Sequence, residues 1–267
     1  DKTRPLAAID DDAKAMSQHL IEFFQNEIKH GRLPKNLLPL QSGVGSVANA
    51  VISGLAQGPF TNLSIFTEVI QDGMFDLIDA GKVEVCSGTA LSPSPDGLKR
   101  FYDNVDLYSK KIILRPQELS NSPELARRLG VIAMNTAIEF DIFGNVNSTH
   151  IMGSKMMNGI GGSGDFARNA YISIFCTNSV AKDGAISSVV PMCSHIDHTE
   201  HDVMVFCTEQ GVADCRGLSP EERARLIIKN CAHPDYKPML EDYLERAIVA
   251  TKTRPYTDFA RRSSFLA

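Results

Sequence analysis

Residues 43–73, GVGSVANAVISGLAQGPFTNLSIFTEVIQDG, decide the fold expected for this chain. The stretch starts as a glycine-rich turn after an apolar run at 36–40, continues into a small-residue helix at 46–55, and reaches an apolar strand at 63–66. Glu68 follows that strand. In open α/β sheets, ligands bind outside the carboxyl ends of the strands. The stretch therefore predicts a backbone cradle for an anion beside a carboxylate.

Strand and helix patterns alternate through the rest of the chain. Residues 10–30 carry apolar side chains at the helical period, and Ser122-Pro123 and Ser219-Pro220 are typical helix starts with an N-cap serine. Strands that alternate with helices predict an α/β domain with a largely parallel sheet flanked by helices. Further strands are expected at 83–86, 111–114, 131–134, 138–142, 171–175, 186–190 and 203–206, and further helices at 74–80 and 98–104.

One of these expected strands has an unusual composition. Residues 138–142 alternate apolar side chains with Glu139 and Asp141. Strict alternation is typical of a strand with one buried and one solvated face. We therefore expect the acidic face of this strand to be wet.

Composition excludes several classes of protein. The chain has 267 residues, of which 43% are hydrophobic and 22% charged, which is ordinary for a globular protein with a packed core. Its net charge is −5 and it has no lysine- or arginine-rich run, so no nucleic-acid partner is predicted. No apolar run approaches the ~20 residues of a membrane span, so no membrane association is predicted.

The cysteines and the N-terminus bear on the cellular setting. Six cysteines are scattered without a CxxC pair, and several lie in apolar runs. This pattern predicts reduced, mostly buried thiols in a cytosol-like compartment. The chain begins at Asp1 without an initiator methionine or the apolar core of a signal peptide. We expect it to be a piece of a longer or processed protein.

Three interpretations of the first glycine loop compete. Residues 43–48, GVGSVA, fit the dinucleotide fingerprint GxGxxA, and Glu68 lies about 20 residues further on, where that fingerprint places an acid. A plain glycine turn for close packing is about equally plausible. In a third interpretation, the backbone N–H groups hold an oxyanion or a thioester carbonyl, and Glu68 is a catalytic carboxylate.

A second glycine loop lies at 159–164, GIGGSG. It also matches GxGxxG, but the residues before it do not form a clean apolar strand. Four glycines in six residues let the backbone approach a ligand closely. The loop predicts a second oxyanion or phosphate cradle, with a flexible turn as the alternative.

The histidines of residues 195–201, HIDHTEH, raise the question of a metal. His195, His198 and His201, with Asp197 and Glu200, could bind zinc. The spacing lacks the tight HExxH pairing and the added cysteines of most zinc sites. A polar loop whose side chains bond each other or a neighbouring subunit is the interpretation we favour, and no metal is predicted.

Four isolated residues are weaker candidates. Glu209 follows the strand at 203–206 and repeats the Thr67-Glu68 pattern of an acid at a strand end. Lys182 lies in a turn and could meet a phosphate. Asn121 and Asn158 lie in loops, where asparagine is normally a turn former.

Five phrases together resemble a known family. They are QSGVGSVANAV, TEVIQDGM, FGNVNSTHIMGSKMMNGIGGSGDFARNA, SHIDHTEHDV and TEQGVADCRGLSPEERA. They are similar to the C-terminal part of the acetyl-CoA hydrolase/transferase family, and within it to class I CoA-transferases of the succinyl-CoA:acetate type. The likeness covers about residues 34–243. It implies a NagB/RpiA/CoA-transferase-like fold for the single domain 1–267, and it implies that an N-terminal half is absent.

The resemblance also implies roles for particular residues. Glu68 matches the glutamate that attacks the acyl-CoA thioester and becomes a glutamyl-CoA thioester, and the backbone N–H groups of Val44 and Gly162 match an oxyanion hole. Asn121 and Glu209 match active-site residues near the nucleophile. The positions that correspond to CoA contacts are Gly43, Val44, Gly45, Ser46, Val47, Asn158, Gly162 and Lys182. Gly164 departs from the pattern, because many members have alanine there.

The implied activity is transfer of CoA between an acyl-CoA and a small carboxylate such as acetate or succinate. The alternatives are acyl-CoA hydrolysis and, more remotely, a nicotinamide-dinucleotide module that uses GVGSVA and Glu68. The resemblance implies CoA as a substrate, no bound metal or redox cofactor, and a homodimer for the full-length protein. It further implies a cytoplasmic protein, or one of the mitochondrial matrix in a eukaryote.

Overall fold

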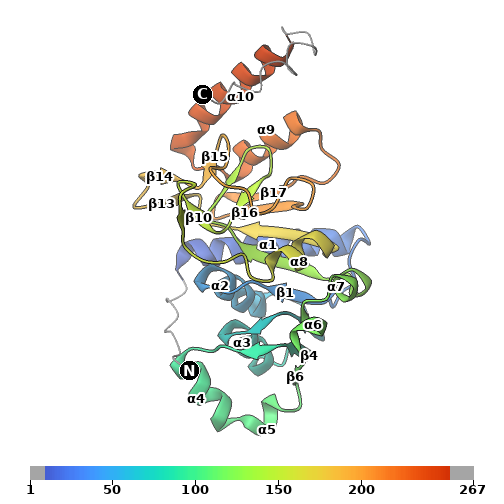
Figure 1. Ribbon diagram of the computed structural model, residues 1–267. Helices are drawn as coiled ribbons and strands as arrows, with labels where there is room; N and C mark the ends of the chain where they lie inside the picture. Colours follow the sequence, from blue (N-terminus) through green and yellow to red (C-terminus); the bar gives the residue numbers. More distant parts are fainter. Residues whose placement is uncertain (1–9, 253–267) are drawn as a thin grey trace.

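An eight-stranded sheet forms the centre of the computed structural model, which describes residues 10–252 (Figure 1). Seven of its strands are parallel, and the edge strand β17 runs antiparallel to β16. The order across the sheet is β17 (Gly211–Asp214), β16 (Val205–Thr208), β12 (Ile172–Cys176), β7 (Ile132–Thr136), β1 (Leu40–Ser42), β2 (Leu63–Phe66), β4 (Val83–Gly88), β6 (Ile112–Leu114). The predicted α/β fold with a largely parallel sheet is confirmed.

The strand order reverses beside β1. From β1 the chain moves outward through β2, β4 and β6, and then returns to place β7 on the other side of β1. Leu40 of β1 pairs with Ile65 of β2 on one side and with Ile132 of β7 on the other. Such a reversal leaves a crevice at the carboxyl ends of the two central strands, where ligands bind in open α/β sheets.

Helices cover both faces of the sheet. The helices α1 (Asp11–Lys29), α2 (Ser46–Gly54) and α3 (Asp72–Asp79) pack on one face over the largest apolar core. The helices α7 (Pro123–Leu129), α8 (Ser163–Asn169) and α9 (Pro220–Cys231) cover the other face. The helices α4 (Pro95–Asp103), α5 (Val105–Tyr108) and α6 (Gln117–Ser120) lie on the β4–β6 side, and α10 (Lys237–Lys252) follows α9 (Figure 1).

Alternation along β12 shows how one strand serves both cores. Ile174 is buried in the core under α1 to α3, and its neighbour Phe175 is buried in the core under α9. Successive side chains of a strand point to opposite faces, so a strand covered on both sides is apolar throughout. This explains the continuous apolar run in the sequence ISIFC.

The helix starts follow the expected chemistry. Ser219 accepts a hydrogen bond from Glu222 N while the Glu222 carboxylate accepts from Ser219 N, a complete capping box with Pro220 in the first turn. Ser122 caps α7 by accepting from Leu125 N. The N-cap of α2 is Gly45 at φ 127, without a side-chain cap. A residue in that conformation is normally glycine.

The expected strands at 138–142 and 186–190 do not join the central sheet. They form β8 (Glu139–Asp141) and β15 (Val189–Val190) of a small three-stranded sheet, in which β8 pairs with β15 on one side and with β9 (Val146–Asn147) on the other. The expectation of a wet acidic face is wrong for Asp141, which is 1% exposed. Its carboxylate accepts hydrogen bonds from Phe143 N and Asn145 N, so it closes a turn instead of facing solvent.

Other small elements are hairpins and paired fragments at the edge of the domain. They are β3 (Val69–Ile70) with β5 (Ala90–Leu91), β10 (His150–Ile151) with β11 (Lys155–Met156), and β13 (Val180–Ala181) with β14 (Ile186–Ser187). The six cysteines all lie within the described residues and are free thiols, five of them buried, as expected. Within residues 10–252, none of the helices combines the length and the apolar character that crossing a membrane demands.

Candidate active site

A cavity of about 560 Å³ opens at the carboxyl ends of the central strands. Its walls come from the residues that follow β1, from Glu68 after β2, from 135–138 at the end of β7, and from the loop 157–163 before α8. The cavity lies where the strand order reverses, at the sheet edge where residues 43–73 predict a ligand site. Its volume falls in the range of ~300–1,000 Å³ that is usual for small-molecule sites.

The backbone around Glu68 is held on both sides. Thr67 is fully buried, and its Oγ1 donates to Ser42 O over 3.1 Å while its N–H donates to Ser87 O over 2.9 Å. The Glu68 carbonyl accepts from Thr89 N at 2.8 Å. These bonds tie the end of β2 to β1 and β4. The Glu68 side chain therefore projects into the cavity from a fixed position.

The Glu68 carboxylate meets Asn121 and Gly162. Asn121 Nδ2 donates to Glu68 Oε2 over 3.0 Å, and Asn121 is buried at the C-terminal end of α6. A Cβ atom at position 162 would overlap both Glu68 Oε2 and Asn121 Nδ2. Only glycine lets the backbone of the second loop lie this close to the carboxylate. The structure thus brings together three of the predicted residues from three distant parts of the sequence.

The first glycine loop also lines the cavity, through Gly43 and Val44. Gly43 N donates to Met134 O at 2.8 Å, and a Cβ at position 43 would lie 2.9 Å from Asn135 Oδ1, so glycine permits the close passage of β1 and β7. Val44 lines the cavity and is 61% exposed. In the part of the chain that the structure describes, the backbone N–H groups of Val44 and Gly162 donate to no protein acceptor.

The remaining predicted contact residues divide into two groups. Asn158 and Gly162 line the cavity. Gly45, Ser46 and Val47 form the start of α2 and are not among the residues that line it. Lys182 is exposed on the hairpin of β13 and β14, at φ 53, and does not line the cavity.

The structure does not bring Glu209 to Glu68. Both residues follow strands at the same edge of the sheet, but β16 and β2 are four positions apart in the strand order. At ~4.8 Å per strand, that separation is roughly 19 Å. The Glu209 carboxylate instead accepts from Ser179 N at 2.8 Å and from Ser179 Oγ. Burial acts to raise the pKa of Glu209, but the hydrogen bonds from Ser179 and Gln210 outweigh it and hold that pKa below its usual value.

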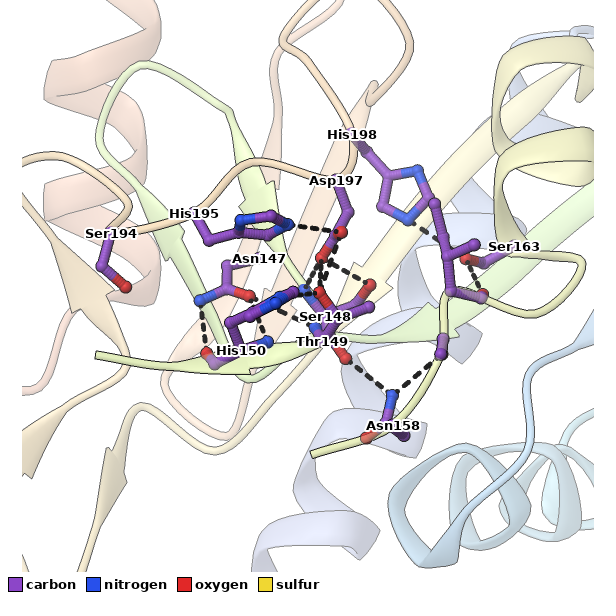
Figure 2. A network of polar contacts seen from close by, with 12 residues as sticks. Asn147, Ser148, Thr149, His150, Asn158, Ser163, Ser194, His195, Asp197 and His198 are labelled. Atoms are coloured by element: carbon purple, nitrogen blue, oxygen red, sulfur yellow. Dashed lines mark hydrogen bonds and ion pairs between the residues drawn. The ribbon is translucent and has the colours of Figure 1, made fainter. Parts of the chain in front are cut away.

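The three histidines of HIDHTEH are separated in space. His201 is exposed beside Glu200, and His198 is buried with its Nε2 3.1 Å from Ser163 Oγ. The His195 ring lies against the His150 ring, with centroids 3.8 Å apart and the planes tilted by 36°, and His195 Nε2 donates to Asp197 (Figure 2).

His150, His195 and Asp197 are the one group among the described residues whose ligand atoms lie within 4.8 Å of each other. Asp197 Oδ2 accepts from Ser148 N and from the hydroxyls of Ser148 and Thr149, and Oδ1 accepts from Thr149 and His195. A carboxylate has about four lone-pair sites, so these contacts occupy it. The geometry is that of a closed hydrogen-bond network, which agrees with the expected polar loop.

The sequence analysis did not identify three polar residues that line the cavity, Gln41, Asn135 and Thr136. Gln41 and Asn135 exchange two hydrogen bonds, 3.1 and 3.2 Å, between the ends of β1 and β7, and Thr136 follows. The signal was present, because polar residues end two strands that are otherwise apolar. The sequence alone could not show that these residues meet, since the pairing of β1 with β7 joins residues 94 apart.

Several known proteins are similar to this chain in sequence or in fold. A succinyl-CoA:acetate CoA-transferase of Clostridium kluyveri is 65% identical over 247 residues, which cover 92% of this chain and 46% of that protein. An acetyl-CoA hydrolase of Candida albicans is 52% identical over 95% of this chain and 49% of its own length. The 4-hydroxybutyrate CoA-transferase of Porphyromonas gingivalis has the same fold, with a TM-score of 0.70 at 23% identity over 92% of this chain and 58% of that one.

The chain spans about half the length of the curated relatives it matches. The model of the acetyl-CoA hydrolase/transferase C-terminal domain matches residues 97–244, more than half of the chain. By this match, and by the relatives that agree with it, the chain belongs to the acetyl-CoA hydrolase/transferase family.

Proposed function

We propose that this chain carries the catalytic glutamate of an enzyme that moves CoA between an acyl-CoA and a small carboxylate. Of the described residues that line the cavity, Glu68 is the one with an ionisable side chain. Two other acids at or near strands are engaged elsewhere, Glu139 with Asn147 and Ser194, and Glu209 with Ser179. That placement of Glu68 is the observation on which the proposal rests.

The first step forms a mixed anhydride. A free oxygen of Glu68 attacks the thioester carbonyl, the carbonyl oxygen becomes negative, and CoA leaves as a thiolate. Val44 and Gly162 both line the cavity, and their backbone N–H groups, which donate to no acceptor among the described residues, are the donors we assign to the oxyanion. One such preorganised donor is worth ~3 kcal/mol of transition-state stabilisation.

The second step stores CoA on the enzyme. The thiolate attacks the Glu68 carbonyl of the anhydride, which releases the donor carboxylate and leaves a glutamyl-CoA thioester. A second carboxylate then attacks this thioester, and the two steps run in reverse to give the new acyl-CoA. No atom changes its oxidation state in the cycle, and the energy of the thioester is conserved in the anhydride and in the glutamyl-CoA thioester.

Hydrolysis is a second candidate for the same site. Relatives of the chain include proteins named acetyl-CoA hydrolase. Glu68 is only half buried, so water could reach the thioester and release free CoA. Comparing CoA transfer to acetate with release of free CoA in the absence of any acceptor separates the two activities. A dinucleotide site is not proposed, because the family match favours CoA chemistry and Asn121 already occupies Glu68 Oε2.

Trapping the intermediate tests the proposal. The complete protein is incubated with an acyl-CoA, reduced with borohydride, digested, and examined by mass spectrometry. We expect the peptide containing Thr67-Glu68-Val69 to lose mass, because reduction turns the thioester into an alcohol. Glu68→Ala should lose both label and transfer while calorimetry still detects CoA binding. A label on Glu209, or near-normal transfer by Glu68→Ala, would contradict the mechanism.

A further inference from the structure

The loop that carries Gly162 has little packing of its own. Gly159 and Gly161 have no atom within 4 Å of the place where a Cβ would lie, and Ile160 between them is 45% exposed. Gly162, in contrast, must lie directly against Glu68. A loop with three glycines in four residues does not hold such a position by itself, because each glycine has wide conformational freedom. Contacts at the two ends of the loop must therefore fix its position.

The first end of the loop is tied to Ser148. Asn158 Nδ2 donates to Ser148 O over 3.0 Å (Figure 2). Ser148 N in turn donates to Asp197 Oδ2 over 2.7 Å. Burial acts to raise the pKa of Asp197, but the hydrogen bonds from Ser148 and Thr149 hold it below its usual value. Asp197 is therefore an ionised anchor, and such charge-assisted bonds are the stronger kind.

The second end of the loop is tied to His198. Ser163, the residue after Gly162, donates its hydroxyl hydrogen to Ile160 O over 2.8 Å. Its Oγ lies 3.1 Å from His198 Nε2. A hydroxyl has one hydrogen to give, and with that hydrogen on Ile160 O we assign the Nε2–H tautomer to His198, which makes Nε2–H the donor in this contact. Figure 2 shows the His198 imidazole directed at Ser163.

His198 is itself held in place by burial, by a ring contact and by backbone hydrogen bonds. Its side chain is 3% exposed and packs against the Phe175 ring, with centroids 4.8 Å apart. Val146 N donates to His198 O at 2.8 Å, and Asp197 N donates to Val146 O at 2.9 Å. Val146 is fully buried in β9. The two anchors of the loop are thus consecutive residues on one short segment that is paired to a sheet.

We propose that His198 is a positioning residue, which holds Gly162 against Glu68 by donating to Ser163 while Asp197 holds the other end of the loop through Ser148. His198 touches no reacting atom in this assignment. It fixes the distance between the Gly162 N–H group and the carboxylate. The kinetic consequence rests on the proposed function, whereas the structural consequence does not.

Loss of the His198 donor should act on the transition state more than on binding. The oxyanion exists only during the reaction, so a displaced Gly162 N–H group weakens kcat more than KM. A lost hydrogen bond to a neutral partner corresponds to roughly a tenfold change in an equilibrium. The chemistry amplifies such a displacement, because a misplacement of about 1 Å can cost a hundredfold in rate.

Two substitutions at position 198 separate donation from packing. His198→Met keeps an apolar side chain of similar size and removes the donor. His198→Gln keeps an N–H donor near the place of Nε2. His201→Gln is the matched control, because His201 is exposed and contacts only Glu200 among the described partners. Ser163→Ala removes the acceptor and completes a double-mutant cycle with His198→Met.

Hydrogen exchange and kinetics on the complete protein give two readouts. In His198→Met, the peptide covering 157–167 should exchange about tenfold faster, and kcat should fall roughly tenfold to a hundredfold with KM within about threefold. His198→Gln should recover most of both losses, and Ser163→Ala should add nothing to His198→Met. Equal losses in the Met and Gln variants, or wild-type exchange in His198→Met, would overturn the inference. A wild-type protein without transfer or hydrolysis would refute the proposed function, and the exchange result would still decide the role of His198.

Discussion

Asn121 Nδ2 donates to Glu68 Oε2 over 3.0 Å, although 53 residues separate the two. Glu68 follows β2, and Asn121 ends the short helix α6 after four further strands of the fold. The bond holds Oε2 and leaves Oε1 as the oxygen that can attack a substrate. Asn121 therefore decides which way the proposed nucleophile is turned.

Removing this amide should slow catalysis without unfolding the protein. We expect Asn121→Ala and Asn121→Leu to lower kcat by roughly tenfold to a hundredfold, because a nucleophile that rotates freely reaches attack geometry less often. CoA affinity should change little. Steady-state kinetics and calorimetry measure the two effects, and Asn26→Ala is the control, since Asn26 is exposed and lies outside this cavity. Unchanged kcat in both Asn121 variants would contradict the role.

Two glycines of the second loop should respond in opposite ways to alanine. A Cβ at Gly162 would overlap Glu68 and Asn121, so Gly162→Ala should abolish activity. Gly164 lies in α8, and a Cβ there would meet only Ile160 Cδ1 at 3.8 Å, an ordinary contact. Gly164→Ala should therefore keep activity and add about 0.5–1 kcal/mol of stability. Denaturant unfolding with parallel assays tests the pair, and an active Gly162→Ala protein would contradict the site geometry.

The βαβ stretch at 43–73 was predictable because its signals are local. The helix expected at 46–55 is α2, and the strand expected at 63–66 is β2, since glycine turns and apolar runs act over a few residues. The apolar run at 36–40 only reaches the first strand, which is Leu40–Ser42, because Pro39 cannot donate a hydrogen bond to a neighbouring strand and the pairing with β7 begins at Leu40.

Strand order and side-chain pairing were not predictable from the pattern. Glu209 and Glu68 have the same local setting, yet four strand positions separate them. Only the family resemblance predicted that Glu68, Asn121 and Gly162 belong to one site. Local patterns could not, since the contacts join segments that are 41 to 94 residues apart. The carboxyl ends of strands can be located in a sequence, but their neighbours across the sheet cannot.

We predict that the purified protein holds no stoichiometric zinc. The metal-like group of His150, His195 and Asp197 is closed by hydrogen bonds that occupy the Asp197 oxygens. Elemental analysis should find well below one zinc per chain, and a chelator should change neither the melting temperature nor the activity. His195→Ala should cost only modest stability. One tightly held ion per chain, lost together with stability, would show that the network opens to bind metal.

Burial of His198 should make folding sensitive to acid. Burial lowers the pKa of His198, and the carboxylates of Asp197 and Asp202 oppose this without outweighing it. Above the ordinary pKa of histidine, about 6.5, the ring is neutral in both states and contributes no pH dependence. As pH falls below that value, the unfolded chain takes up a proton that the folded protein refuses. The folded state therefore loses stability down to the lowered pKa, by at most about 1.4 kcal/mol per pH unit.

His198→Gln removes this titration and keeps the contact to Ser163. Urea unfolding of both proteins between about pH 7.5 and pH 5 should show a steeper loss of stability in the wild type. The acids elsewhere in the chain titrate in both proteins, so the difference between the two curves isolates His198. Parallel curves would mean that the ring takes up its proton equally well in the fold. A wild type that gains stability relative to His198→Gln as pH falls would reverse the sign, and would place His198⁺ in a pair with Asp197 or Asp202.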